Sequence, residues 1–211
     1  MRSLLLAVAV AGLTACQSAY YEAAEQVGYH KRDILVDRVE DSRDAQQEAE
    51  EQFQSALEQL SELTSFDGGD LEDMYQAMAD EYESSAAAAD EVRERIDAVE
   101  HVAEALFLEW QDEIGQFSNQ RMKSESQARL QETRRRYDDM IRVMRGSEAK
   151  MHPVLVALND NVLYLKHNLN ARAVASLQVE FRQIEQDIEL LIVEMRKAIA
   201  TSDAFIASMQ Q

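Results

Sequence analysis

The sequence predicts an all-α fold, an elongated antiparallel bundle of four long helices with coiled-coil-like packing. Two observations carry this prediction. The chain has 211 residues but only six glycines and one proline, the residues that most often interrupt helices. Apolar residues recur at spacings of three and four over long stretches, as on the buried face of an amphipathic helix. Strand-like alternation does not stand out in any stretch.

The first helix is expected to begin near Tyr20 and to end before Phe66. A turn is predicted near residues 66–70, because Gly68 suits the left-handed end of a helix and Asp70 can cap the next one. The buried face of this helix is marked by apolar residues three or four apart: Ala45, Ala49, Phe53, Ala56, Leu60 and Leu63.

The second helix shows a heptad-like series, typical of a long bundle: Ala89, Val92, Ile96, Val99, Ala103, Leu106, Trp110 and Phe117. The large aromatic residues Phe107, Trp110 and Phe117 are therefore expected in the core. Apolar residues lapse after Phe117, which predicts a turn near 118–125 and a third helix from about Ser126.

Pro153 falls inside the third helical segment, where a proline removes a backbone hydrogen bond. The apolar series continues past it, which favours a kink. A turn is expected near 167–170, with Asn170 capping the last helix. One long kinked helix over the C-terminal part stays open as an alternative. Four helices of about 40–50 residues, each about 65 Å long, suit an up-down-up-down bundle.

The N-terminus has the layout of a secretory signal. A positive start with Arg2 precedes an apolar run over residues 4–13, and small Ala15 precedes Cys16, the only cysteine. The run is about half of what a bilayer span needs, and a disulfide within the chain requires a second cysteine. The ending Leu13-Thr14-Ala15-Cys16 resembles the bacterial lipobox.

This resemblance implies that residues 1–15 are removed, that Cys16 is acylated, for example with palmitate, and that residues 16–19 form a short tether. A disulfide between two chains stays open as an alternative. In bacterial lipoproteins an aspartate directly after the cysteine retains the protein in the inner membrane. Gln17 stands at that position, so the resemblance implies the periplasmic face of the outer membrane, with the inner membrane as the alternative.

The net charge of −19, or −20 without Arg2, excludes nucleic-acid binding, which requires a positive surface. It also leaves the acyl group as the contact with anionic lipid. Residues 37–113 hold 25 acidic and four basic residues, whereas residues 121–150 hold nine basic and five acidic. We interpret this as a basic helix beside acidic ones, rather than as a surface for an envelope phosphate or glycan. The basic cluster comprises Arg134, Arg135, Arg136, Arg142 and Arg145.

No residue pattern indicates catalysis or a cofactor, so we expect neither. The four histidines lack metal-ligand spacing and are expected at the surface: His30, His101, His152 and His167. The acids near the first turn are weak candidates for a cation site, since capping and helix-dipole compensation explain them: Asp67, Asp70, Glu72 and Asp73. The candidate partner-binding residues are Asp67, Asp70, Asp73, Arg134, Arg135 and Arg136.

Four segments spread over the chain carry a resemblance to a known family: Cys16 to Tyr21, His30 to Asp41, Phe66 to Glu72, and Val162 to Ala171. In these segments the sequence is similar to proteobacterial coiled-coil lipoproteins grouped as domain of unknown function 2959. The resemblance implies a coiled-coil lipoprotein of Gram-negative bacteria. It implies no activity, ligand or catalytic residue.

The sequence thus predicts a non-enzymatic envelope lipoprotein that serves as a scaffold, spacer or adaptor. The alternative is a ligand- or cation-sensing module. An envelope protein and a second copy of the chain are the macromolecular partners considered. Basic residues are expected toward the lipid end (Lys31, Arg32, Arg121, Lys123, Arg196 and Lys197), and the acids at 67–73 toward the far end.

Overall fold

The computed structural model describes residues 30–64, 71–168 and 170–210. These residues form four long helices and one short helix: α2 (Lys31–Thr64), α3 (Leu71–Gln116), α4 (Gln120–His167), α5 (Ala171–Ser176) and α6 (Gln178–Met209). The described ranges contain no strand. The predicted all-α helical bundle is confirmed. Among the described residues, no helix has the length and apolar character needed to cross a bilayer.

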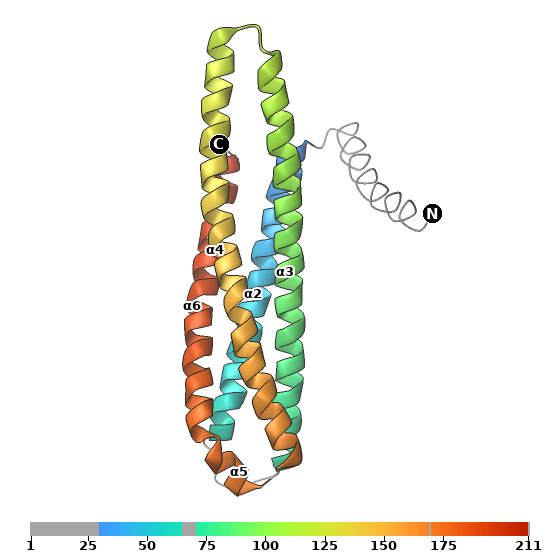
Figure 1. Cartoon of the computed structure of the whole chain (residues 1–211), viewed down its shortest axis with the longest axis vertical. Coiled ribbons are helices and arrows are strands. Elements are labelled where there is room, and N and C mark those ends of the chain that lie inside the picture. The colour runs from blue at the N-terminus through green and yellow to red at the C-terminus, as the bar shows by residue number, and fades with distance from the viewer. Residues whose placement is uncertain (1–29, 65–70, 169, 211) are drawn as a thin grey trace, which may run out of the picture.

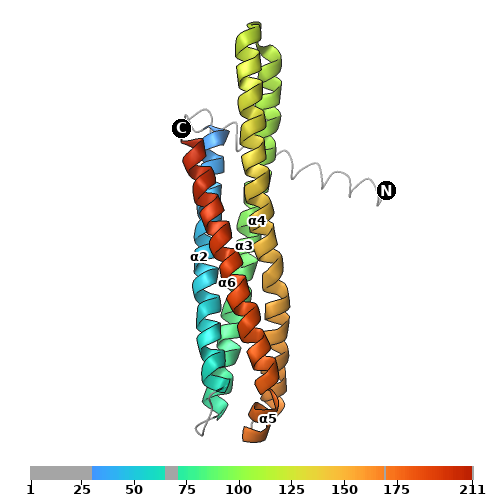
Figure 2. The same cartoon turned by 90° about the vertical axis from the view of Figure 1, so that its left-hand side faces the viewer.

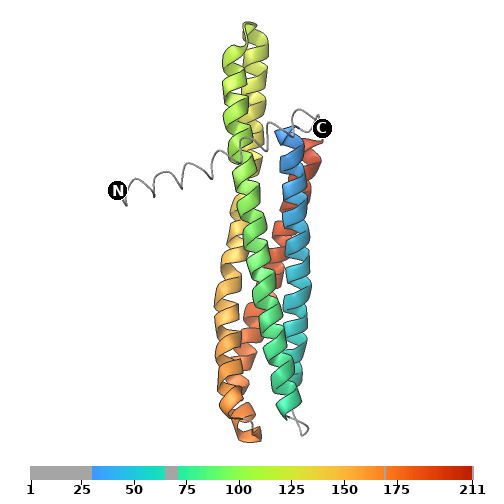
Figure 3. The ribbon, with the colours of Figure 1, turned by 90° about the vertical axis from the view of Figure 1, so that its right-hand side faces the viewer.

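The long helices alternate in direction along one shared axis (Figure 1). Helix α2 packs on α3 and α6, and α4 packs on the same two helices, so α2 and α4 occupy opposite corners of the bundle. The short α5 links the ends of α4 and α6 (Figure 1). Helices α3 and α4 extend beyond the start of α2 and the end of α6 as a two-helix hairpin (Figures 2 and 3). We call this part the projecting hairpin.

One hydrophobic core includes residues from all four long helices. The predicted buried face of α2 is confirmed at Phe53 and Leu60, which are fully buried, and the α3 series is buried from Val92 to Leu106. The series then leaves the core. Trp110 is half-buried, and Phe117 is 37% exposed. The prediction that Phe117 is a core residue was wrong, because α3 ends at Gln116 and Phe117 lies in the turn to α4, whereas Ile114 in the last turn of α3 is buried.

The long helices are not of equal length, since α2 and α6 have 34 and 32 residues whereas α3 and α4 have 46 and 48. Helix α2 begins at Lys31. Residues 20–29, where the first helix was expected to begin, lie outside the described residues. The predicted turn at 66–70 also lies outside them. Helix α4 begins at Gln120, so residues 120–125 are helical and not a turn.

Asn119 explains the early start of α4. Its side-chain oxygen accepts hydrogen bonds from the backbone N–H groups of Arg121 (3.0 Å) and Met122 (3.2 Å). With this cap the helix begins at Gln120, six residues before Ser126, the predicted start. The turn between α3 and α4 is accordingly confined to residues 117–119.

The C-terminal part of the chain forms two long helices, because α4 continues through Pro153 and ends at His167. Asn168 closes α4: its backbone N–H donates to the Leu165 carbonyl (3.0 Å) and its side-chain amide to the Tyr164 carbonyl (2.9 Å). Asn170 precedes the short α5 and not the last long helix, so it does not cap α6 as predicted. Helix α6 starts after Leu177, without a side-chain cap.

Candidate functional site

A pocket lies where α2 begins and α6 ends, beside the base of the projecting hairpin. Two adjoining cavities of about 360 Å³ each share three residues from three helices, namely Arg32 of α2, Trp110 of α3 and Arg129 of α4. We call these cavities together the arginine–tryptophan pocket. The first is also lined by His30, Lys31, Leu106, Glu109 and Glu113, and the second by Glu132, Thr133, Arg136, Ser208 and Met209.

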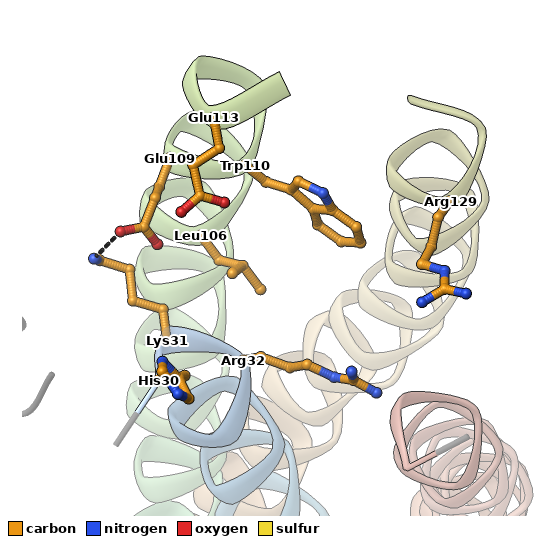
Figure 4. A pocket seen from close by; sticks show the side chains of 8 residues that line it. All are labelled: His30, Lys31, Arg32, Leu106, Glu109, Trp110, Glu113 and Arg129. Carbon is orange, nitrogen blue, oxygen red and sulfur yellow. Dashed lines mark hydrogen bonds and ion pairs between the residues drawn. The ribbon is translucent and has the colours of Figure 1, made fainter. Parts of the chain in front are cut away.

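Trp110 forms the wall between α3 and α4. It follows Leu106 on the core-facing side of α3, at the level where α2 begins, and its indole N–H donates to the Ser126 hydroxyl of α4 (3.0 Å). Figure 4 shows the indole extending from α3 toward α4. Its polar edge is therefore satisfied and its position held, while half-burial leaves part of the ring accessible.

Two carboxylates that line the pocket are neutralised by neighbouring cations. Glu109 accepts a hydrogen bond from the Lys31 ammonium (2.8 Å). Glu132 is bound by the guanidinium groups of Arg135 and Arg136, with a distance of 2.9 Å from Arg136 Nε. The hydrogen bonds from Arg135 and then Arg136 lower the pKa of Glu132 below its ordinary value.

Arg32 and Arg129 differ from these paired groups. Neither guanidinium has a hydrogen bond, an ion pair or a ring contact with any described residue. Figure 4 shows both side chains extending into the space on one side of Trp110. The carboxylates of Glu109 and Glu113 lie on the other side, toward Lys31 (Figure 4). On this side of the pocket the one carboxylate that lines the second cavity, Glu132, is bound by Arg135 and Arg136, so Arg32 and Arg129 remain without an ion pair among the described residues.

The predicted arginine cluster is mostly occupied by contacts within the bundle. Arg134 lies over the Phe107 ring at 5.1 Å, which is a cation–π contact. Arg135 and Arg136 bind Glu132 on their own helix, so only Arg136 also reaches the pocket. The three candidate partner-binding arginines are therefore near the pocket, but Arg32 and Arg129 are its unpaired cations.

Arg145 shows how the basic helix and the acidic helix meet. It binds Asp97 and Glu100 of α3, with 2.6 Å to Glu100 Oε2, and lies near Glu148 of α4. The hydrogen bond with Glu100 is the largest of the effects that raise the pKa of Arg145. At this position the basic helix packs beside acidic residues, as expected. Nearby, burial raises the pKa of Tyr137.

The predicted acidic end is described only in part. Asp67 and Asp70 lie outside the described residues, and Glu72 and Asp73 are exposed in the first turn of α3, at the end opposite Lys31 (Figure 1). No group of three or more His, Cys, Asp or Glu side chains that could hold a metal occurs in the described part of the chain. Its four histidines are all exposed, as expected.

The expected polarity of charge is correct at the ends and wrong in the middle. Lys31 lies at one end of the bundle, and Arg121 and Lys123 lie in the projecting hairpin beyond it. Arg196 instead pairs with Glu50, midway along α2, at 2.7 Å, so it and its neighbour Lys197 are not at that end. A polar residue three turns from the end of a helix cannot be assigned to a bundle end by sequence order alone.

A second hollow lies between the end of α4 and the start of α6. It has a volume of about 580 Å³ and is lined by apolar side chains such as Tyr164, Leu177 and Ile184, with carboxylates of Asp160 and Asp187. It lies near α5, at the opposite end of the bundle from the arginine–tryptophan pocket.

The sequence did not reveal the arginine–tryptophan pocket. Trp110 looked like one more core residue, Arg32 was only one of several basic residues, and Arg129 was not singled out. One feature of the sequence points to the pocket. The apolar series of α3 continues to Trp110, whereas α4, which packs beside it, has few apolar residues before Leu130. The pocket depends on where α2 and α6 stop.

The family model described as protein of unknown function DUF2959 matches residues 20–209. No curated protein and no solved structure matches the chain. Because the family model spans nearly the whole helical part, including every helix of the bundle, the chain belongs to the DUF2959 family.

Proposed function

We propose that this protein is a non-enzymatic lipoprotein of the bacterial envelope, in which an acylated Cys16 anchors the helical bundle as a scaffold, spacer or adaptor. The observation that carries the proposal is the bundle itself. Helix α4 has 48 residues and is about 70 Å long at 1.5 Å per residue. Packed core residues on all four long helices make the bundle a stiff rod rather than a flexible chain.

The position of Cys16 gives this rod an orientation. Residues 17–30 separate Cys16 from α2, and 14 residues span at most about 50 Å, so a lipid on Cys16 keeps the start of α2 within about that distance of the membrane. The projecting hairpin lies at this end, and the first turn of α3 lies at the other (Figure 1). In this proposal the anchor is at the periplasmic face of the outer membrane, and the distal end, with Glu72 and Asp73, meets an envelope partner.

Processing of the precursor tests the anchor. Globomycin, which blocks the lipoprotein signal peptidase, should cause the precursor to accumulate, and Cys16→Ala should prevent both processing and membrane association. Density-gradient fractionation then assigns the outer or the inner membrane. If Cys16→Ala leaves processing and membrane fractionation unchanged, the protein is not a lipoprotein.

Fluorescence quenching tests the orientation. Single labels are placed on Ser118→Cys in the turn of the projecting hairpin and on Asp73→Cys at the opposite end, in lipidated protein reconstituted into vesicles. A quencher attached to the lipid should reduce emission from the label at 118 and leave the label at 73 bright. Equal quenching at the two positions would mean that the bundle does not stand away from the membrane.

The alternative function, a ligand-sensing module, is favoured by one observation, the unpaired cations of the arginine–tryptophan pocket. For a cation-sensing module, Glu72 and Asp73 are the two of the four predicted acids that lie within the described residues, and both are exposed in the first turn of α3. Helix-dipole compensation accounts for both.

A further inference from the structure

We propose that the arginine–tryptophan pocket is a phosphate-binding site, in which Arg32 and Arg129 bind the phosphate oxygens and Trp110 provides an apolar wall for the group that carries it. This inference goes beyond the scaffold proposal. It does not depend on whether Cys16 is acylated.

The first argument is the distribution of unpaired cations. The chain has about twice as many acidic as basic residues, 40 against 21, so an arginine at its surface is expected to find a carboxylate. Within the described ranges, only four arginine side chains have neither an acid nor a ring as partner: Arg32, Arg129, Arg172 and Arg182. Two of these four line the same pocket, although they come from different helices.

The second argument is the separation of charges by Trp110. Figure 4 places Arg32 and Arg129 on one side of the indole, and Glu109 and Glu113 on the other. Glu109 is bound by Lys31, and Glu132 by two other arginines. An anion that enters between Arg32 and Arg129 therefore meets two guanidinium groups without displacing an existing ion pair. Arg32 and Arg129 are both exposed, so solvent and salt weaken the repulsion between their charges, and a bound anion removes what is left of it.

The start of α2 adds to the positive potential. Arg32 lies in the first turn of a 34-residue helix, whose backbone dipole has its positive end there. Asp33 is the acidic residue in the first turn of α2. Its carboxylate accepts a weak hydrogen bond from the backbone N–H of His30 (3.4 Å), at the start of the same helix. The dipole therefore favours an anion beside Arg32.

Phosphate fits this pocket better than a carboxylate. One guanidinium fork is enough to match the two oxygens of a carboxylate, whereas a phosphate offers at least one further oxygen to a second fork from another direction. Leu106 and Met209 line the two cavities beside Trp110 and offer apolar contact to a carbon group attached to the phosphate. A soluble phosphate monoester and a lipid headgroup share this chemistry.

Trp110 makes the proposal directly measurable, because it is the only tryptophan in the chain. The full chain, in non-ionic detergent, is titrated with inorganic phosphate and with phenyl phosphate while tryptophan emission is recorded. A second titration uses mixed micelles that contain phosphatidic acid, with diacylglycerol as the matched lipid that lacks phosphate. Saturable emission changes with the soluble compounds identify a soluble ligand, and changes with phosphatidic acid alone identify a lipid headgroup.

The variants decide whether the pocket is responsible. Arg32→Gln and Arg129→Gln are each expected to raise the Kd about tenfold or more, the effect of losing one charged hydrogen-bonding group, and Arg129→Lys less. Arg182→Gln, the matched control, removes another unpaired arginine outside the pocket and should leave the Kd unchanged. Far-UV circular dichroism verifies that each variant is helical.

Two results would overturn the proposal. One is the absence of a saturable emission change with all phosphate compounds. The other is an equal loss of affinity in Arg182→Gln and in the pocket variants, which would indicate general charge attraction. Neither result touches the lipoprotein proposal, because these titrations do not involve processing at Cys16.

Discussion

Gln46 allows a demanding test of how the core is stabilised. Its side chain is fully buried on α2, and neither its amide nitrogen nor its amide oxygen has a hydrogen-bond partner among the described residues. A buried polar group without a partner costs about 1–3 kcal/mol. Leucine has a similar volume and no polar atoms, so Gln46→Leu removes this cost and retains the packing. We expect the free energy of unfolding to rise by about 1–3 kcal/mol.

Urea unfolding followed by circular dichroism measures this effect. The midpoint should move to higher urea while the slope m stays constant, since the surface exposed on unfolding hardly changes. Gln47→Leu is the matched control, because Gln47 is the exposed neighbour on the same helix, and its effect should stay within about 0.5 kcal/mol.

The opposite outcome would refute this reasoning. If Gln46→Leu lowers the free energy of unfolding, the amide of Gln46 makes favourable interactions that its surroundings in the bundle do not indicate. If it also broadens the oligomer distribution in size-exclusion chromatography, the buried amide sets the register of the helices, a role known for single polar residues in coiled coils.

Three further substitutions test other parts of the bundle. Phe53→Ala, at a fully buried position, should cost about 3–5 kcal/mol in urea unfolding, whereas Leu190→Ala, at a position 63% exposed, should change stability by less than about 0.5 kcal/mol; similar losses would contradict the assigned core. Pro153→Ala should raise the free energy of unfolding by about 1–3 kcal/mol, and with it the thermal midpoint, because it restores a backbone donor inside α4. An unchanged midpoint would mean that the bundle already compensates for the proline. Arg145→Gln should cost about 1 kcal/mol at low salt and less at high salt, because it removes the contacts with Asp97 and Glu100; a loss independent of salt would point to packing instead.

The candidate site could be predicted from the sequence only in part. The cluster Arg134–Arg136 is conspicuous because its members are adjacent, yet the structure gives these arginines partners at Phe107 and Glu132. The unpaired cations of the pocket, Arg32 and Arg129, are almost a hundred positions apart. Spacing rules describe neighbours on one helix, whereas this pair is created by the packing of different helices.

Helix content and the buried faces follow from the sequence alone. Residues three or four positions apart lie on one side of a helix, whatever that helix packs against. The sequence therefore identifies Phe53, Leu60, Val92 and Ile96 as core residues before the neighbouring helix is known. The tertiary structure decided the ends: the cap at Asn119, the start of α2 at Lys31, and the end of α3 at Gln116, which leaves Phe117 in a turn outside the core. These depend on where neighbouring helices stop covering one another, which periodicity within a helix does not encode. The arginine–tryptophan pocket lies at such an end, and therefore only the packed bundle reveals it.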